Sequence, residues 1–268
     1  MSTALRIVVA GAGGRMGHAV ISALRNRNDA VLHAALEAPG NASLGKDAGM
    51  MAGGAPLNVP VTQDALAAVV RADAIIDFTT PASSVALAAL AAQARIVHVI
   101  GSTGFAAADE EKIKAAARHA VIVKSGNFSL GVNALMMLVR EAARMLPAYD
   151  AEIVETHHAQ KADAPSGTAL MIARAIAEGR KLTPEDVIAP PHHGLTGPRQ
   201  RGRIAIASVR AGSVVGDHTA IFAGARERIE ITHRAEDRAI FAEGALAAAL
   251  WGHGKKPGLY SMEDVLRG

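Results

Sequence analysis

The segment Glu155–Ala169, ETHHAQKADAPSGTA, gathers side chains that move protons and bind anions. Two histidines, His157 and His158, are adjacent, and Lys161 follows three residues after the second. An imidazole titrates near neutral pH and passes protons, and a lysine ammonium donates a proton or supplies a fixed positive charge. The spacing therefore predicts acid–base chemistry.

Ser166, Gly167 and Thr168 begin an apolar helical pattern directly after Pro165. The free N–H groups and hydroxyls of a helix start suit a carboxylate. A glycine at this point lets a ligand lie against the backbone. We predict that this turn holds a carboxylate beside the proton donors, as in a reductase that acts on a carboxylated substrate.

Two other interpretations of the histidine pair remain open. A zinc site needs at least three protein ligands, and adjacent residues of a strand point to opposite faces. His192 or His193 could supply a third ligand, but both lie in a Pro- and Gly-rich loop. The pair could also lie in a polar loop in which one histidine is hydrogen-bonded. Because the imidazoles, the ammonium and the helix start complement one another, we favour acid–base chemistry and expect no metal.

A glycine loop, GAGGRMG, occupies Gly11–Gly17, between an apolar run and a helical pattern. Glycines let the backbone approach a pyrophosphate, and the following helix start offers N–H groups and a partial positive charge. The standard G-x-G-x-x-G fingerprint is not matched, because Met16 occupies the position of its third glycine. The pattern G-x-x-G-x-x-G is matched in full. Glu37 closes the second apolar run, where a dinucleotide site needs a carboxylate for the ribose hydroxyls. The alternative is a plain tight turn, and we favour a dinucleotide site.

The elements around these residues change in type along the chain. The first half predicts alternating strands and helices, which are typical of βαβ units in a parallel sheet. The predicted strands are 5–11, 30–36, 74–78, 96–100 and 120–124, the predicted helices are 16–27, 64–71, 81–92 and 107–118, and 39–60 is a predicted loop. GSTG at Gly101–Gly104 and SGNF at Ser125–Phe128 follow two of these strands, at the edge of the sheet where ligands gather.

The second half predicts an α+β layer with an antiparallel or mixed sheet, because several strands follow one another without helices between them. The predicted elements are a helix at 132–146, a strand at 151–157, a helix at 167–180, a loop at 189–202 and strands at 204–210, 218–223 and 228–234.

The composition excludes several classes of protein. Charge is nearly balanced, with 28 Lys and Arg against 25 Asp and Glu, and only 3% of residues are aromatic, so we expect no nucleic-acid partner. No cysteine is present, which excludes disulfides, a thiolate nucleophile and cysteine-bound zinc or iron–sulfur clusters. The sequence has neither a signal-peptide pattern nor an apolar run of bilayer length, so we expect a cytoplasmic protein without a membrane partner.

The pattern E-x-H-H-x-x-K-x-D-x-P-S-G-T-A strongly resembles the signature of the 4-hydroxy-tetrahydrodipicolinate reductase (dihydrodipicolinate reductase) family of bacterial lysine and diaminopimelate biosynthesis. The segments VAGAGGRMG, IDFTTP, GSTGF, NFSLGVN, VRAGSVVGDHTAIF and ERIEITHRA resemble that family in the same order, over nearly the whole chain. The resemblance implies NAD(P)H-dependent reduction of 4-hydroxy-tetrahydrodipicolinate, a cyclic imine dicarboxylate, to tetrahydrodipicolinate.

The resemblance also implies roles for individual residues. His157 is implied as the proton donor or acceptor and Lys161 as the second acid, while His158 contacts the substrate and Ser166, Gly167 and Thr168 form the substrate site. The implied cofactor contacts are Gly11, Ala12, Gly13, Gly14, Arg15, Met16, Glu37, Gly101, Ser102, Thr103, Ser125, Gly126, Asn127 and Phe128.

One position departs from the family pattern. Many members carry Arg directly after the acidic residue, where it meets the 2′-phosphate of NADPH, and this chain has Ala38 there. The cofactor is therefore expected to be NADH or NADPH, and Glu37 without the arginine favours NADH.

The implied fold is α/β, with a Rossmann-like parallel-sheet domain and an α+β substrate and oligomerisation domain that contains a mixed sheet. The first domain would comprise residues 1–128 and 239–268, and the second, through which a homotetramer assembles, residues 129–238.

Two rival functions share part of this pattern. Another two-domain NAD(P)-dependent dehydrogenase of a small carboxylated substrate would have the glycine loop but no need of the His-His-Lys-Ser-Gly-Thr string. A non-catalytic dinucleotide-binding sensor would need an output module, and the sequence shows no basic helix-turn-helix segment or linker to one.

Overall fold

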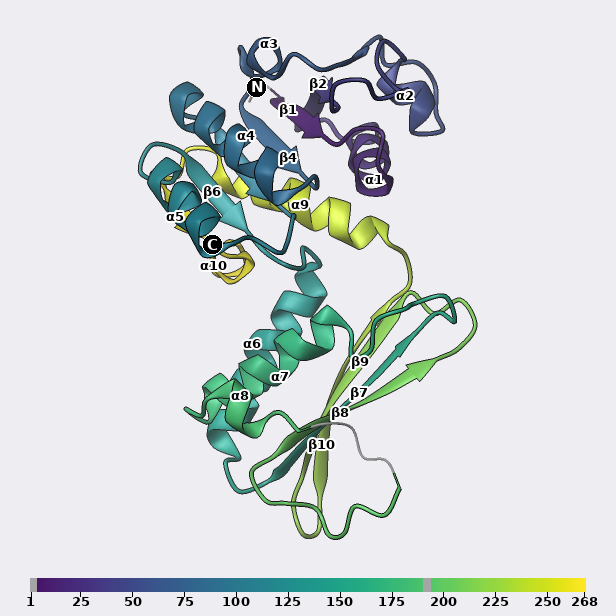
Figure 1. Cartoon of the computed structure of the whole chain (residues 1–268), viewed down its shortest axis with the longest axis vertical. Helices are drawn as coiled ribbons and strands as arrows, with labels where there is room; N and C mark the ends of the chain where they lie inside the picture. Colours follow the sequence, from purple (N-terminus) through teal and green to yellow (C-terminus); the bar gives the residue numbers. More distant parts are fainter. Residues whose placement is uncertain (1–3, 190–193) are drawn as a thin grey trace. The chain divides into compact units, whose positions relative to one another are not determined.

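The computed structural model describes residues 4–189 and 194–268, which form two compact units. The first unit runs to Leu130 and resumes at Ala239–Gly268, and the second is Gly131–Arg238. Figure 1 labels the elements of both units along the chain. The described residues include no helix that is both long enough and apolar enough to span a membrane.

The first unit is built on a parallel sheet of seven strands in the order β11-β6-β5-β4-β1-β2-β3. Its strands are β1 (Leu5–Ala10), β2 (Ala30–Leu36), β3 (Val61–Thr62), β4 (Ala74–Asp77), β5 (Val97–Ile100), β6 (Val121–Lys124) and β11 (Gly258–Tyr260). Its helices are α1 (Arg15–Leu24), α2 (Ala48–Met51), α3 (Ala65–Val69), α4 (Pro81–Ala94), α5 (Ala107–Ala116), α9 (Ala239–Gly252) and α10 (Met262–Arg267). The Rossmann-like fold class predicted from the alternating pattern is confirmed.

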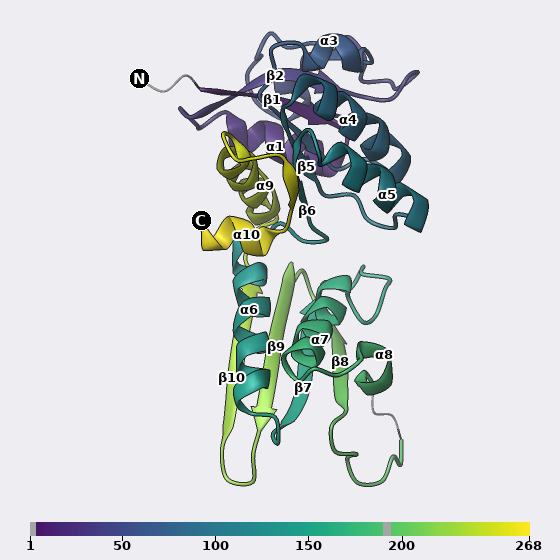
Figure 2. The ribbon, with the colours of Figure 1, turned by 90° about the vertical axis from the view of Figure 1, so that its left-hand side faces the viewer.

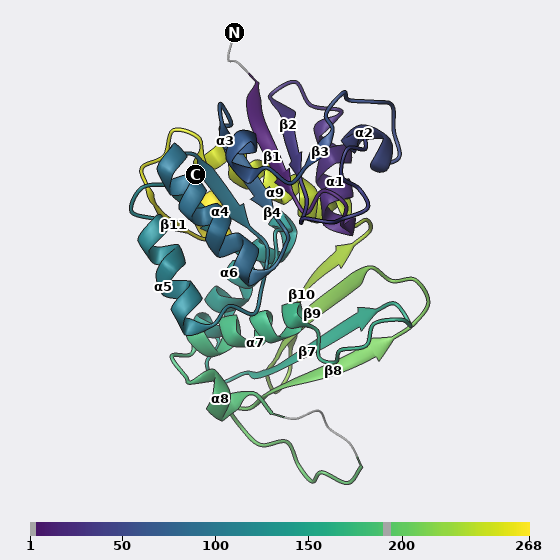
Figure 3. The ribbon, with the colours of Figure 1, turned by 45° about the horizontal axis from the view of Figure 1, so that its top comes forward.

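Helices cover both faces of this sheet, which explains why its central strands β4 and β5 are mostly apolar and are buried at every position. Successive side chains of a strand point to opposite faces, so Ile7 packs with α1 and α9, and Val8 packs with α4 and α5. Figure 3 shows α4 on one side of the sheet and α9 on the other.

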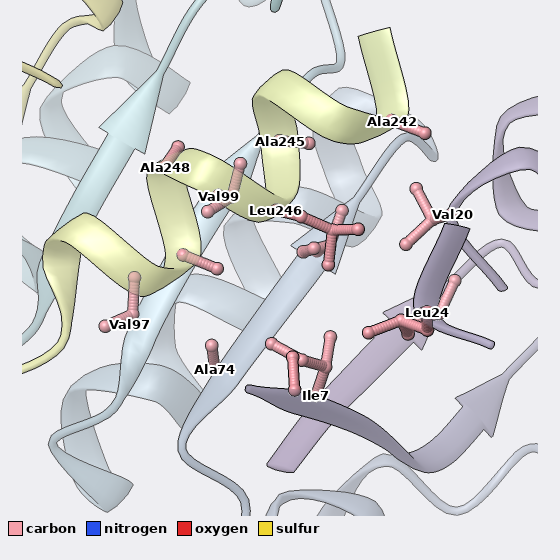
Figure 4. Packing of buried hydrophobic residues seen from close by; sticks show 14 of the residues in the cluster. Ile7, Val20, Leu24, Ala74, Val97, Val99, Ala242, Ala245, Leu246 and Ala248 are labelled. Carbon is pink, nitrogen blue, oxygen red and sulfur yellow. The ribbon is translucent and has the colours of Figure 1, made fainter. Parts of the chain in front are cut away.

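The last segment of the chain completes the first of these two cores. Ala242, Ala245, Leu246 and Ala248 of α9 pack against strand residues such as Ile7, Val97 and Val99, as the close view in Figure 4 shows. A Cβ at Gly244 of α9 would lie 1.7 Å from the carbonyl oxygen of Phe128, so only glycine permits this approach. The α9 helix is thus an integral part of the first unit.

The second unit has a four-stranded mixed sheet in the order β10-β9-β7-β8, in which β7 and β8 are parallel and the other pairs are antiparallel. The strands are β7 (Asp150–His157), β8 (Ile204–Arg210), β9 (Gly216–Ala223) and β10 (Arg228–Ala235). The helices are α6 (Leu130–Met145), α7 (Gly167–Gly179) and α8 (Pro184–Val187). Residues of α6 and α7 form one core with alternate residues of the sheet, and Figure 2 shows both helices over the same face. The predicted mixed sheet is confirmed.

The expectation of a plain loop over residues 39–60 was wrong, because α2 lies within it and β3 begins directly after it. The carboxylate of Asp47 accepts hydrogen bonds from the N–H groups of Met50, Leu57 and Val59, which caps α2 and folds the segment back on itself. Hydrogen bonds to one side chain therefore organise this segment. Sequence-based prediction relies on hydrophobic periodicity, so it missed the helix.

Candidate active site

The glycine loop forms a tight turn between β1 and α1, and two of its positions require glycine. Gly11 has φ +74°, a conformation that favours glycine, and a Cβ at Gly17 would lie 2.2 Å from the carbonyl oxygen of Gly11. Gly14 precedes the first residue of α1 and has no side chain to cap the helix. The free N–H groups of this helix start are therefore available to an anion.

Glu37 at the end of β2 is fixed toward the glycine loop. Its Oε2 accepts a hydrogen bond of 2.8 Å from the N–H of Gly13, and its Oε1 accepts one of 3.0 Å from the N–H of Ala38. A cavity of about 630 Å³ lies beside this pair. Its lining is Ala10, Gly11, Gly13, Gly14, Leu36, Glu37, Ala38, Pro39, Asn41, Gln63, Ala65, Phe78, Thr79, Thr80, Ser83 and Leu87. Glycines, one carboxylate and an apolar wall suit the ribose and base of a dinucleotide.

The other two loops at the ends of strands are held by internal bonds. The Ser102 side chain is buried and shares a hydrogen bond with Ser84 of α4. Ser125 donates its hydroxyl proton to the carbonyl of Asn127, and Phe128 is buried with its ring 5.7 Å from that of Phe78. The side chains of Ser102 and Phe128 therefore shape the loops from within, and their predicted cofactor contacts would come from the backbone.

Several predicted cofactor residues do not line the 630 Å³ cavity. Those outside its lining are Ala12, Arg15, Met16, Gly101, Ser102, Thr103, Ser125, Gly126, Asn127 and Phe128. Gly101 follows β5, and a Cβ there would lie 2.2 Å from the ring of Phe78, so the residue must be glycine for this packing. The roles of all these residues stay predictions.

In the second unit, His157 ends β7 with its side chain only 10% exposed. Its Nδ1 is hydrogen-bonded to Oε2 of Glu155, which lies two residues earlier on the same face of the sheet and is fully buried. Arg210, at the end of the neighbouring strand β8, donates to both oxygens of Glu155 at 3.0 and 2.9 Å. His218 on β9 completes the group, with its ring 5.1 Å from that of His157.

Sequence reasoning missed Glu155, Arg210 and His218 as parts of the site. One signal was available for Glu155, because residues two apart on a strand point to the same face and Glu155 precedes His157 by two. Arg210 and His218 lie in the family-like segment VRAGSVVGDHTAIF, but only the register between strands places them beside His157.

Lys161 and His158 lie in and beside the loop that follows β7. The Nζ of Lys161 is 2.8 and 2.9 Å from the two oxygens of Asp163, whose side chain is 62% exposed. His158 accepts a hydrogen bond of 3.2 Å at Nε2 from the guanidinium of Arg238. The Asp163 partner is accessible to solvent, so Lys161 can exchange it for an anionic ligand.

The predicted carboxylate turn is only partly open. Ser166 is the N-cap of α7: its Oγ accepts a hydrogen bond from the N–H of Ala169 at 3.1 Å and shares another of 3.1 Å with His218. Gly167, in contrast, is exposed and has no atom within 4 Å of the place where a Cβ would be. The space for a ligand therefore lies over Gly167, and the hydroxyl of Ser166 serves the helix cap.

The charges of the site favour neutral imidazoles beside an ionised carboxylate. Burial lowers the pKa of His157, and the opposing effect of Glu155 does not fully compensate, because Lys161 and Arg210 lower it further. Burial, helped by the nearby His157, lowers the pKa of His218 to about 4. The free protein at neutral pH therefore holds both rings mainly in the neutral form.

Glu155, His157 and His218 place three potential metal-ligand atoms within 4.8 Å of one another. The imidazole of His157 already contacts Glu155, and the imidazole of His218 contacts Ser166. Arg210 puts a positive charge on the carboxylate that a metal cation would have to displace. The other candidates, His192 and His193, lie outside the described residues. This geometry favours an ion-paired acid–base site, and the absence of a metal stays a prediction.

Two family models match the chain almost end to end. The model described as dihydrodipicolinate reductase, N-terminus, matches residues 5–128, and the model described as dihydrodipicolinate reductase, C-terminus, matches residues 131–266.

Curated relatives and solved structures agree with the family models. The chain is 59% identical to the 4-hydroxy-tetrahydrodipicolinate reductase of Beijerinckia indica subsp. indica, over 98% of this chain and 97% of the relative. It is 57% identical to the reductase of the same description from Parvibaculum lavamentivorans, over 99% of each chain. A dipicolinate-bound dihydrodipicolinate reductase from Paenisporosarcina sp. TG-14 shares 26% identity and a TM-score of 0.78, over 97% of this chain and 99% of that one.

Other dehydrogenases share only the fold. The amine dehydrogenase of Mycobacterium smegmatis aligns with a TM-score of 0.60 and 13% identity, over 97% of this chain and 95% of that one.

Proposed function

The chain belongs to the dihydrodipicolinate reductase family, and on this premise we propose which of its residues carry out the reaction. The reaction is the NAD(P)H-dependent reduction of 4-hydroxy-tetrahydrodipicolinate in diaminopimelate and lysine biosynthesis. Our proposal concerns the acids, the carboxylate site and the cofactor preference. The observation that supports it most is the convergence of His157, Lys161 and the open start of α7 within one unit.

When bound, the nicotinamide cofactor supplies a hydride to ring carbon 4 of the dehydrated substrate. The protein must then supply a proton to the neighbouring ring carbon, which carries the developing negative charge. Lys161 stabilises this charge as a cation or donates the proton itself. His157 gives or takes a proton at Nε2, because its Nδ1 is bonded to Glu155.

We assign the open backbone at Gly167, together with the neighbouring Thr168, to one substrate carboxylate, with His158 near the ring or the other carboxylate. Gly167 leaves room above the helix start, and α7 of 13 residues adds its dipole. A flat dicarboxylate, pyridine-2,6-dicarboxylate, should therefore inhibit competitively with the substrate.

The matching mono-acid, pyridine-2-carboxylate, should inhibit more weakly by a factor of roughly 10–150, because losing a charge-assisted hydrogen-bonding group costs about 1.5–3 kcal/mol. Inhibition constants of the two acids measure this difference in the parent protein and in Thr168→Val. The variant should lose most of the difference and keep its NADH affinity. Equal inhibition of the parent by both acids would contradict the carboxylate site.

For the cofactor, we propose that NADH is used at least as well as NADPH. Ala38 offers only a methyl group to the cavity beside Glu37, and no lysine or arginine is among the described residues that line it. A 2′-phosphate would meet the carboxylate of Glu37 without a compensating cation.

The ratio of kcat/KM for the two cofactors tests this proposal. Ala38→Arg should shift the ratio toward NADPH, and Ala38→Gln, of similar length without the charge, is the matched control. A preference of the parent protein for NADPH above about tenfold, or about 1.4 kcal/mol, would contradict the proposal. It would mean that a base outside the cavity lining, such as Arg15 or Lys46, reaches the phosphate.

We also propose a homotetramer assembled through the sheets of the second unit. The helices α6 and α7 cover one face of this sheet, and the opposite face presents apolar and small residues at its centre with charged residues among them, such as Asp217 and Glu230. The apolar and small residues include Val154, Ala207, Val209, Thr219 and Ile221. Sedimentation equilibrium of the full chain measures the mass in solution, and a monomer at micromolar concentration would contradict this assembly.

A further inference from the structure

A buried ion pair, Glu155 with Arg210, lies directly beneath the groups assigned to acid–base chemistry. We propose that Glu155 is a positioning residue. It fixes the proton of His157 on Nδ1, so that the Nε2 lone pair faces the substrate. Together with Arg210, it also fixes the positions of the Lys161 loop and the start of α7 relative to the His157 ring. This inference deepens the proposed function and rests on it.

The first support is the number of groups that converge on one carboxylate. Glu155 is fully buried and its Oε2 contacts Nδ1 of His157. Its Oε1 accepts a hydrogen bond of 3.3 Å from the backbone N–H of Ser166, the N-cap of α7. Arg210 donates to both carboxylate oxygens. One side chain thus links the histidine to the predicted carboxylate turn.

Arg210 extends the connection to the loop that carries Lys161. Its Nη2 donates a hydrogen bond of 2.6 Å to the carbonyl of Asp163, the residue whose carboxylate pairs with the Lys161 ammonium. The three functional parts of the unit therefore share a single support, which gives their relative placement a physical cause. Catalysis is sensitive to such placement, because small displacements of a reacting group lower the rate strongly.

The second support is the hydrogen-bonding capacity of the carboxylate. Burial opposes ionisation of Glu155, but hydrogen bonds from Arg210, Ser208 and His157 outweigh it and lower the pKa of the carboxyl group. An ionised carboxylate only accepts hydrogen bonds, so Nδ1 of a neutral His157 must carry the proton. The proton on the ring then leaves Nε2 as the basic atom.

The third support is the open space on the other edge of the ring. Gly216 at the start of β9 lies against this edge, and a Cβ there would be 3.0 Å from Nε2 of His157. Within the part of the chain that the structure describes, this Nε2 makes no hydrogen bond, in contrast to Nδ1. Glycine at 216 therefore leaves the basic nitrogen accessible.

Stability alone does not explain the ion pair. Buried ion pairs are often replaced by apolar residues with no loss of stability, because removing two charges from water offsets their attraction. The titratable and charged groups that face His157 come from each element around it. They are Glu155 on β7, Arg210 on β8, His218 on β9 and Lys161 in the loop after β7. Glu155 is the only acid of these four, and it contacts the ring directly.

Nitrogen-15 NMR of the histidine rings in the full-length parent protein tests the tautomer without any activity measurement. The His157 resonances are assigned by their absence from the spectrum of His157→Ala. We expect the shift of Nδ1 in the protonated range and that of Nε2 in the unprotonated range at neutral pH. A neutral ring protonated on Nε2 would overturn the proposal.

Steady-state kinetics of Glu155→Gln test the positioning role. We expect kcat to fall roughly 10–100-fold, as when the partner that orients a functional histidine is removed, with little change in NADH affinity. Because Glu155 raises the pKa of His157, the limb of the kcat–pH profile that His157 sets should move to lower pH in the variant. Glu178→Gln, which breaks the exposed pair with Arg140, is the control and should keep the parent profile.

The outcomes separate this inference from the function on which it rests. A folded Glu155→Gln variant with the parent kcat and pH profile would overturn the positioning role, and so would a lowered Tm without any change in the profile. A parent protein with the expected tautomer but no reduction of 4-hydroxy-tetrahydrodipicolinate would instead contradict the proposed function.

Discussion

Lys161→Ala should lower kcat by roughly 10²–10⁴-fold, the range that general acid–base catalysis contributes. The side chain of Lys161 is only 19% exposed, and its partner Asp163 is largely in solvent, so the variant removes the cation that is available to the substrate. NADH affinity should change little, because the glycine loop and Glu37 belong to the first unit. Single-turnover rates and NADH titrations of the variant measure both effects.

Two further variants make this test specific to the position of the charge. Lys181→Ala removes an exposed lysine beyond the end of α7 and should keep the parent kcat. Lys161→Arg retains a cation but cannot release its proton, so it should recover only the electrostatic part of the loss. Normal turnover of Lys161→Ala would remove this residue from the mechanism.

His157→Ala should also lower kcat by roughly 10²–10⁴-fold. The variant deletes the ring whose Nδ1 is bonded to Glu155 and leaves a buried carboxylate with Arg210 as its remaining charged partner. His119→Ala, which removes an exposed histidine of the first unit, is the matched control and should be active.

The pH dependence gives this second prediction a direction. Burial and the neighbouring cations lower the pKa of His157, so the protonated ring disappears as pH rises through a value below the usual one near 6.5. If the imidazolium is the acid, kcat of the parent should decline over that pH range. The residual activity of His157→Ala should lack this decline, and a variant that retains it would show that another group titrates.

Much of the first unit could be predicted because its signals are local. The strand β1, the glycines after it and Glu37 at the end of β2 form one short stretch of sequence, and the structure brings Glu37 to 2.8 Å from the N–H of Gly13. Parallel strands buried on both faces are mostly apolar, so the run of strands was visible without knowledge of their order. The boundaries moved by only a few residues.

The surroundings of His157 in the second unit could not be predicted in the same way. Arg210 is 53 residues beyond His157, and only the parallel register of β7 with β8 places the two side by side. His218 is placed by the antiparallel register of β9. Ser166 also has a different immediate use from the predicted one, because the need to cap α7 engages its hydroxyl. The pairing of distant strands therefore determines the composition of the site, whereas the local sequence indicated only some of its residues.

Because the chain returns to the first unit at α9, the two units must complete their folding in a fixed order during protein synthesis. A ribosome releases the glycine loop first, but α9 and β11 leave it only after the whole of Gly131–Arg238. The second unit is contiguous and can fold as it emerges, whereas the first must wait for its last helix. A nascent or prematurely terminated chain thus carries every residue predicted to bind the dinucleotide while the apolar surface meant for α9 is exposed. Chaperones and proteases would encounter that surface until translation ends, so only finished chains acquire a complete cofactor domain.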